Sequence, residues 1–118
     1  MDSILTSIKK MLGLTEEYTH FDTDIIMHIN TVFMTLNQIG VGPAEGFYIE
    51  DDSAEWSEFI PDPAKLQAVK TYIYLKVKIL FDPASIGSST LASYERMIQE
   101  YEWRLNAAVE TKETIESM

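Results

Sequence analysis

Two histidines, a glycine-rich stretch and a group of carboxylates are the side chains of this sequence that could do chemistry. His20 and His28 stand eight positions apart, so they do not share a helical turn as the histidines of a zinc-binding helix do. We expect one loop histidine and one solvent-facing helix histidine. The stretch 39–46 lacks the lysine and hydroxyl residue of a phosphate loop, and its Glu45 would repel a phosphate.

The carboxylates also lack the setting of a catalytic pair. Asp51 and Asp52 are adjacent in an expected loop, where both are normally ionised and solvated instead of holding two different pKa values. The ligand spacing of a calcium loop and the Gly-x-Ser-x-Gly elbow are absent, and the chain has no cysteine. The sequence therefore predicts no catalytic residue, no cofactor and no metal site, and no enzyme.

Aromatic side chains give a stronger signal of function. Tyrosine and tryptophan are favoured where a partner buries a surface, and here several lie on segments already supplied with aliphatic residues. We therefore expect an oligomer, while an ordinary core position remains the alternative for each side chain. The candidate interaction residues are Phe47, Tyr48, Trp56, Phe59, Tyr72, Tyr74, Tyr101 and Trp103.

A small bundle of about four helices is expected to position these residues. Apolar side chains recur with helical spacing in four segments, and Gly13 should end the first helix. Asp22 or Thr23 is expected to cap the start of the second helix. The tail, about residues 110–118, is expected to fray. The first predicted helix runs from Asp2 or Ser3 to Leu12, and the second from Asp22 or Thr23 to about Ile39. The third runs from about Pro63 to about Phe81, and the fourth has its apolar stripe from Leu91 to Ala108.

A long acidic and aromatic loop separates the second and third helices. Between Glu45 and Asp62 lie seven carboxylates and several large apolar residues, but no lysine or arginine. Ser53 is expected to cap one short helical turn that runs through Trp56. Two roles remain open for the loop: an interaction element that is mobile in the free subunit and orders on assembly, or a cap on the core.

Composition indicates one folded, strongly acidic domain. The chain has 118 residues, of which 46% are hydrophobic and 11% aromatic, so we assign residues 1–118 to a single all-α domain. The formal net charge of -10 opposes the neutralisation of phosphates on which DNA binding depends. We therefore expect no specific nucleic-acid binding. A plainer alternative is that the acidity serves solubility.

No apolar run approaches the roughly 20 residues of a membrane-spanning helix. The first fourteen residues carry an acidic residue at Asp2 and lysines in their middle, unlike a signal peptide. We expect synthesis in the cytoplasm and no membrane partner.

Eight short segments carry a resemblance to a known family: 8–13 IKKMLG, 15–17 TEE, 22–26 DTDII, 28–30 HIN, 38–43 QIGVGP, 68–76 AVKTYIYLK, 80–83 LFDP and 102–106 EWRLN. Their succession, over nearly the whole chain, resembles the small head-tail connector proteins, also called adaptor or head-completion proteins, of long-tailed phages and prophages. The resemblance implies a helical structural protein of the virion, made in the bacterial host. It also implies a ring, usually twelvefold, that binds the portal and the next tail-proximal protein while DNA passes through its channel.

Negative charge suits such a channel, because an acidic lumen repels phosphates and lets DNA slide past. The loop from Glu45 to Asp62 is our candidate for the lumen lining. The main alternative is an acidic helical binding protein, either a DNA mimic or an inhibitor of a basic partner. A helical DNA-binding protein is disfavoured by the net charge.

Overall fold

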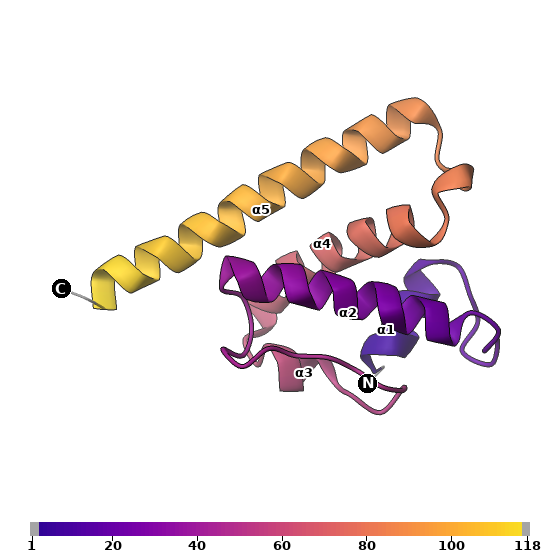
Figure 1. The fold of residues 1–118 in the computed structure, drawn as a ribbon, viewed down its shortest axis with the longest axis horizontal. Helices are drawn as coiled ribbons and strands as arrows, with labels where there is room; N and C mark the ends of the chain where they lie inside the picture. Colours follow the sequence, from indigo (N-terminus) through magenta and orange to yellow (C-terminus); the bar gives the residue numbers. More distant parts are fainter. Residues whose placement is uncertain (1–2, 117–118) are drawn as a thin grey trace.

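The computed structural model describes the backbone of residues 3–116 and the side chains of residues 3–108. Within that part the chain is helical and contains no strand (Figure 1). The all-α class and the bundle of four main helices are confirmed, and a further four-residue helix lies inside the long loop. The elements are α1 (Ile4–Met11), α2 (Asp22–Ile39), α3 (Trp56–Phe59), α4 (Pro63–Phe81), the 3-10 turn η1 (Pro83–Ser85) and α5 (Ser88–Glu116).

Helix α2 is the centre of the bundle and contacts α1, α4 and α5. In Figure 1 it lies in front of α4, while α5 crosses above both. Its apolar stripe is fully buried, as helical spacing predicts. Among the described side chains of α5, by contrast, only Ile98 is buried, while Tyr94, Tyr101 and Leu105 are partly buried against the core. The buried residues of α2 are Ile25, Ile29, Val32, Phe33 and Leu36, and those of α4 are Val69, Tyr72, Ile73, Leu75 and Val77.

Most helix ends follow the local signals in the sequence. The Thr6 N–H donates to the Ser3 side-chain oxygen at 3.2 Å, and Gly40 ends α2 with a left-handed φ of 99°. The capping role predicted for Asp22 or Thr23 is wrong, because α2 begins at Asp22 and Phe21 precedes it without a side-chain cap. The fraying predicted for residues 110–118 falls outside the described side chains and stays a prediction.

The acidic loop, residues 45–62, is fastened to the helices through its backbone. The side-chain amide of Asn30 donates to the Ile49 carbonyl at 2.9 Å, and the Ile49 N–H donates back to the Asn30 side-chain oxygen at 2.8 Å. In the middle of the loop, the Ile4 N–H donates to the Ala54 carbonyl at 2.9 Å. The loop therefore connects α2 with the start of α1.

Aromatic side chains of the loop close the base of the core. Trp56 is 2% exposed, and its indole N–H donates to the Ser7 hydroxyl at 3.0 Å. Phe33 of α2 meets Phe47 and Phe59 with ring centroids 5.2 and 4.6 Å apart. These contacts support the second role weighed for the loop, a cap on the core.

The short helix α3 starts differently from the prediction. Ser53 was expected to cap it, and that expectation is wrong. Helix α3 begins at Trp56, and Glu55 and Glu58 form a capping box at its start. The Ser53 N–H and hydroxyl both donate to the Asp51 carboxylate instead, at 2.9 and 2.5 Å.

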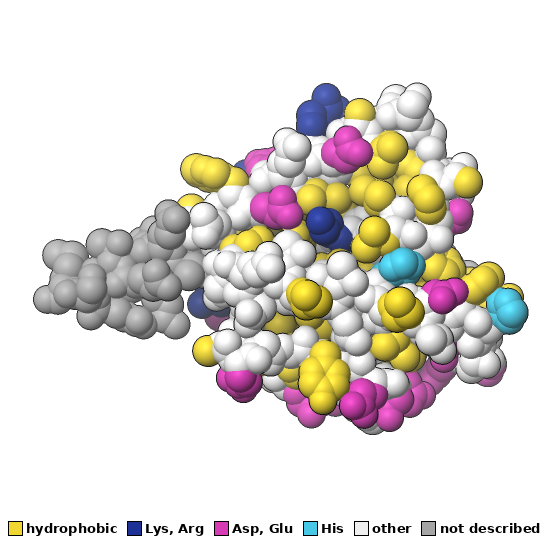
Figure 2. Space-filling model, viewed as in Figure 1, with side chains coloured by type: hydrophobic (Ala, Val, Ile, Leu, Met, Phe, Trp, Pro, Cys, Tyr) yellow, Lys and Arg dark blue, Asp and Glu magenta, His cyan; other side chains and the backbone are white. Residues whose placement is uncertain are grey.

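Most carboxylates of the loop are exposed, whereas Trp56 and Phe59 of the same loop are buried. In the space-filling view the acidic side chains gather along one edge of the molecule, below α2 (Figure 2). Exposed members of this acidic edge are Glu45, Glu50, Asp51, Asp52, Glu58 and Asp62. One loop thus supplies both a charged outer surface and an apolar inner one.

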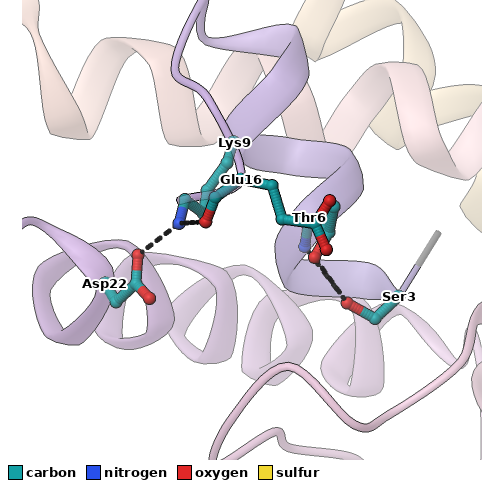
Figure 3. A network of polar contacts seen from close by, with 5 residues as sticks. All are labelled: Ser3, Thr6, Lys9, Glu16 and Asp22. Carbon is teal, nitrogen blue, oxygen red and sulfur yellow. Dashed lines mark hydrogen bonds and ion pairs between the residues drawn. The ribbon is translucent and has the colours of Figure 1, made fainter. Parts of the chain in front are cut away.

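A buried lysine joins α1 to α2 (Figure 3). Lys9 is 2% exposed, and its ammonium group lies 2.9 Å from an Asp22 carboxylate oxygen and 2.9 Å from the Glu16 carbonyl. The Asp22 contact is an ion pair and not an aligned hydrogen bond. Burying a charge is unfavourable unless partners compensate it, so this pair fixes where the α1–α2 connection can lie.

Replacing Lys9 by methionine should lower the free energy of unfolding by about 2 kcal/mol, because the stem is kept while the Asp22 charge loses its partner. Urea denaturation would measure the change. The loss should shrink in an Asp22→Asn background, where the charge is already gone. A loss below about 0.5 kcal/mol, typical of a surface pair, would contradict the buried-pair account.

Replacing Trp56 by alanine should remove about 3 kcal/mol or more of stability, because a large buried side chain leaves a cavity. Tyr48→Ala in the same loop is the matched control: its side chain is 68% exposed, so we expect a change within about 0.5 kcal/mol. Thermal or urea unfolding of both variants would decide. Unchanged stability of Trp56→Ala would show that the loop is undocked in the free subunit.

Candidate interaction surface

Within residues 3–108, no three histidine, cysteine or carboxylate side chains converge to hold a metal ion. The His20 ring is exposed and meets Phe21 edge-on, with ring centroids 4.7 Å apart. His28 lies partly buried on α2. The structure thus places the two histidines in separate elements, one in the α1–α2 connection and one on the helix.

The glycine-rich stretch 39–46 has a packing role. Gly40 ends α2, and the Asn37 side chain donates to the Pro43 carbonyl at 3.2 Å. Gly42 has a φ of +91°, and a Cβ there would come within 2.5 Å of the Phe59 ring. Glycine is therefore needed for the close approach of this turn to the aromatic cluster, which consists of Phe33, Phe47 and Phe59.

Three of the eight candidate interaction residues lie inside the subunit. Trp56, Phe59 and Tyr72 are 2%, 3% and 0% exposed. In this conformation they offer no surface to a partner, so a contact through them would require the core to open. These three side chains are buried by the packing of neighbouring elements. Local sequence does not tell which side of a helix or loop those neighbours cover.

Tyr72 also belongs to a polar link between α4 and α5. Its hydroxyl donates to the Glu102 carboxylate at 2.7 Å, and the Lys76 ammonium lies 4.0 Å from the same carboxylate. Burial raises the pKa of the Tyr72 phenol, and the hydrogen bond and charge of Glu102 raise it further. Glu102 is thus held by two residues of α4.

The other five candidate residues reach the surface to different degrees. Tyr48 and Trp103 are 68% and 72% exposed, whereas Phe47, Tyr74 and Tyr101 are partly buried. Tyr48 stands between Phe47, in the aromatic cluster, and Ile49, which Asn30 holds. An exposed aromatic side chain on a fastened backbone is well suited to binding, because little conformational entropy remains to be lost.

Sequence reasoning missed two exposed methionines. Met27 and Met34 of α2 are 63% and 65% exposed, so this helix has an apolar outer stripe as well as its buried one. A signal was present: from Ile25 to Ala44 the chain has no aspartate, glutamate, lysine or arginine. Such a run in a chain of this charge marks a surface without charge, and Figure 2 shows yellow and white atoms over much of α2.

Two shallow grooves flank α5. The groove between α2 and α5 has a volume of about 460 Å³, and that between α4 and α5 about 310 Å³. Both are open to solvent. The first is lined by Thr35, Gln38, Ile39, Glu102, Trp103 and Asn106, and the second by Lys76, Ile79, Leu80, Glu95, Ile98, Gln99 and Glu102.

Asp51 is the member of the acidic edge whose charge its neighbours stabilise. The Asp51 carboxylate accepts two hydrogen bonds from Ser53, which lower the pKa of Asp51. It therefore stays charged at neutral pH. Because the loop contains no lysine or arginine, no base within it neutralises the neighbouring acids.

Within the described residues, every helix is too short or too polar to cross a bilayer.

Comparison with known proteins shows the family to which this sequence is similar. A family model described as phage connector protein matches residues 4–112, nearly the whole chain. No curated protein and no solved structure matches the chain significantly. The match covers all the helices that build the core and the whole acidic loop, and it confirms the resemblance found in the sequence. The family is structural and not enzymatic, and its members are virion proteins that interact with other phage head or tail proteins. The chain belongs to the phage connector protein family.

Proposed function

We propose that this chain is a subunit of the ring that joins the phage head, at its portal, to the tail, and that DNA leaves through the channel of that ring. The acidic edge is the observation that carries this proposal. Every subunit of a ring turns one edge toward the axis. If the acidic edge of residues 45–62 takes this position, the lumen is lined with carboxylates. The loop contributes no lysine or arginine to it.

A lumen of this kind would let DNA pass without holding it. Lysine and arginine bind DNA by neutralising phosphates and releasing counterions, and the acidic edge offers neither residue. Repulsion between carboxylates and phosphates acts over a Debye length, about 8 Å at physiological salt. The duplex would therefore stay centred in the channel during packaging and ejection.

The partners in this proposal are other copies of the chain, in twelvefold symmetry in the virion, the portal on the head side, and the next tail-proximal protein on the other side. Exposed Tyr48 and Trp103 and the two grooves beside α5 provide surfaces for them. The subunit would be made in the host cytoplasm and act in the virion, at the head-tail interface.

A second function, an acidic protein that binds a basic partner or mimics DNA, is favoured by the same exposed carboxylates. The two functions differ in where the protein is found. A DNA mimic acts on a host or phage enzyme and binds it with an affinity that falls as salt rises. A connector subunit remains in the purified virion.

The isolated protein should fail to retain duplex DNA at physiological salt, because its net charge of -10 opposes binding. The triple variant Glu50→Lys, Asp51→Lys, Asp52→Lys should begin to bind, since it turns part of the acidic edge basic. A gel-shift series with random duplex would compare the two proteins. Retention of the duplex by the unchanged protein at micromolar concentration would contradict the channel proposal.

The protein should be monomeric or weakly associated when dilute and form closed rings when concentrated or when mixed with portal particles. A ring closes only when the rotation between neighbours fits, which makes its assembly cooperative. Native mass spectrometry and negative-stain images would follow the transition. If the chain neither forms rings nor binds the portal at any concentration, the connector proposal fails and the acidic binding protein becomes the better explanation.

A further inference from the structure

The outer side of α2 forms an uncharged stripe, which we define as Met27, Thr31, Met34, Thr35 and Gln38. These residues recur at the spacing that puts them on one side of a helix, and all are exposed or partly exposed. The stripe is the outer part of the run from Ile25 to Ala44 that has no aspartate, glutamate, lysine or arginine.

Two exposed aromatic residues border the stripe. On one side Asn30, a helical turn from Met27 and from Met34, holds Ile49 and so places the neighbouring Tyr48 beside the stripe. On the other side Trp103 shares a groove with Thr35 and Gln38. Figure 1 shows the same order, with the loop below α2 and α5 above it.

Charge decides which partner fits this surface. Two copies of a protein with a net charge of -10 repel each other, and the repulsion is greatest where carboxylates face carboxylates. An uncharged face allows like-charged copies to approach with the least repulsion. A basic partner, in contrast, would be attracted most strongly to the acidic edge and least to a stripe without charge.

The size of the surface is also adequate for a self-contact. Met27, Met34, Tyr48 and Trp103 are 63%, 65%, 68% and 72% exposed. Large aromatic side chains bury about 150–250 Å² each, so Tyr48 and Trp103 alone supply on the order of a third of the roughly 800 Å² that each partner of a standard interface contributes, and the two methionines add to it. The surrounding threonine and glutamine side chains make a neutral polar rim, as in many interfaces.

We propose that the uncharged stripe of α2, together with Tyr48 and Trp103, is the surface on which a second copy of this chain docks. This inference rests on the proposed function, since it names the face used between neighbours in the ring. In a closed ring the contact is heterologous, so the stripe of one copy meets a different surface of the next. The acidic edge stays outside the contact and remains free to face the channel.

Cysteine labelling would test the contact, because the chain has no cysteine of its own. We would introduce Met34→Cys into the stripe and, as a control, Ser57→Cys into α3, where Ser57 is exposed within the acidic loop. On assembly the maleimide reaction of the Met34→Cys thiol should slow by about tenfold or more, while that of the Ser57→Cys thiol stays within about twofold. Slowing at position 57 and not at position 34 would overturn the proposal.

Salt dependence gives an independent test with a definite sign. Raising ionic strength from ~0.01 M to ~0.15 M shortens the Debye length from about 30 Å to about 8 Å, so repulsion between copies weakens and association should strengthen. Sedimentation would measure this for the unchanged protein, for Met34→Glu, and for Ser57→Glu as the control with the same added charge. Met34→Glu should stay folded by circular dichroism and lose association, whereas Ser57→Glu should retain it.

Three results would contradict the inference: weaker association at higher salt, unchanged association of Met34→Glu, or no self-association at any concentration. The last result, if the chain still binds portal particles, would leave the connector function standing and remove only this interface. Association through the stripe without any binding to portal particles would have the opposite meaning, since the interface would hold and the proposed function would fail.

Discussion

The structure depends on one constraint, the burial of α2 on three sides. Its stripe of aliphatic residues and Phe33 can leave water only if α1, α4, α5 and the acidic loop all pack around it. Two of these neighbours, α1 and the loop, are also fastened by a polar contact at the edge of the core. Lys9 holds the start of α2 from α1, and Asn30 holds the loop. Between Met27 and Gln38 the outer side of α2 remains exposed and carries no aspartate, glutamate, lysine or arginine.

The acidic loop shows how one segment serves both stability and function. Its aromatic side chains close the core of the single subunit, while its carboxylates form a surface that no lysine or arginine of the loop neutralises. Separating the two kinds of side chain on one segment gives the subunit two faces: an acidic one suited to a DNA channel and an uncharged one suited to neighbouring copies. A structural subunit needs these faces and no active site.

Much of the fold could be predicted because its signals are local. The apolar spacing located the helices, and Gly13, Gly40 and Pro63 stand at helix ends as expected. What failed depended on contacts distant in sequence. Asp22 has the residue type of a helix cap, but it pairs with Lys9 of another helix. The sequence alone also could not tell that Trp56 and Tyr72 are buried while Tyr48 and Trp103 are exposed. The burial of each side chain depends on how the helices and the loop pack against one another. The uncharged run of α2 could have been noticed, yet its meaning required knowing which side of the helix stays open.

The central claim is that the chain forms a ring between head and tail with its acidic edge toward the DNA. A cryo-electron microscopy reconstruction of the head-tail junction of the assembled virion tests this most directly. The account predicts a ring of this chain next to the portal, with the acidic edge of every copy facing the channel axis. A junction that lacks the chain, or a ring whose acidic loops lie on the outer surface away from the DNA, would contradict it.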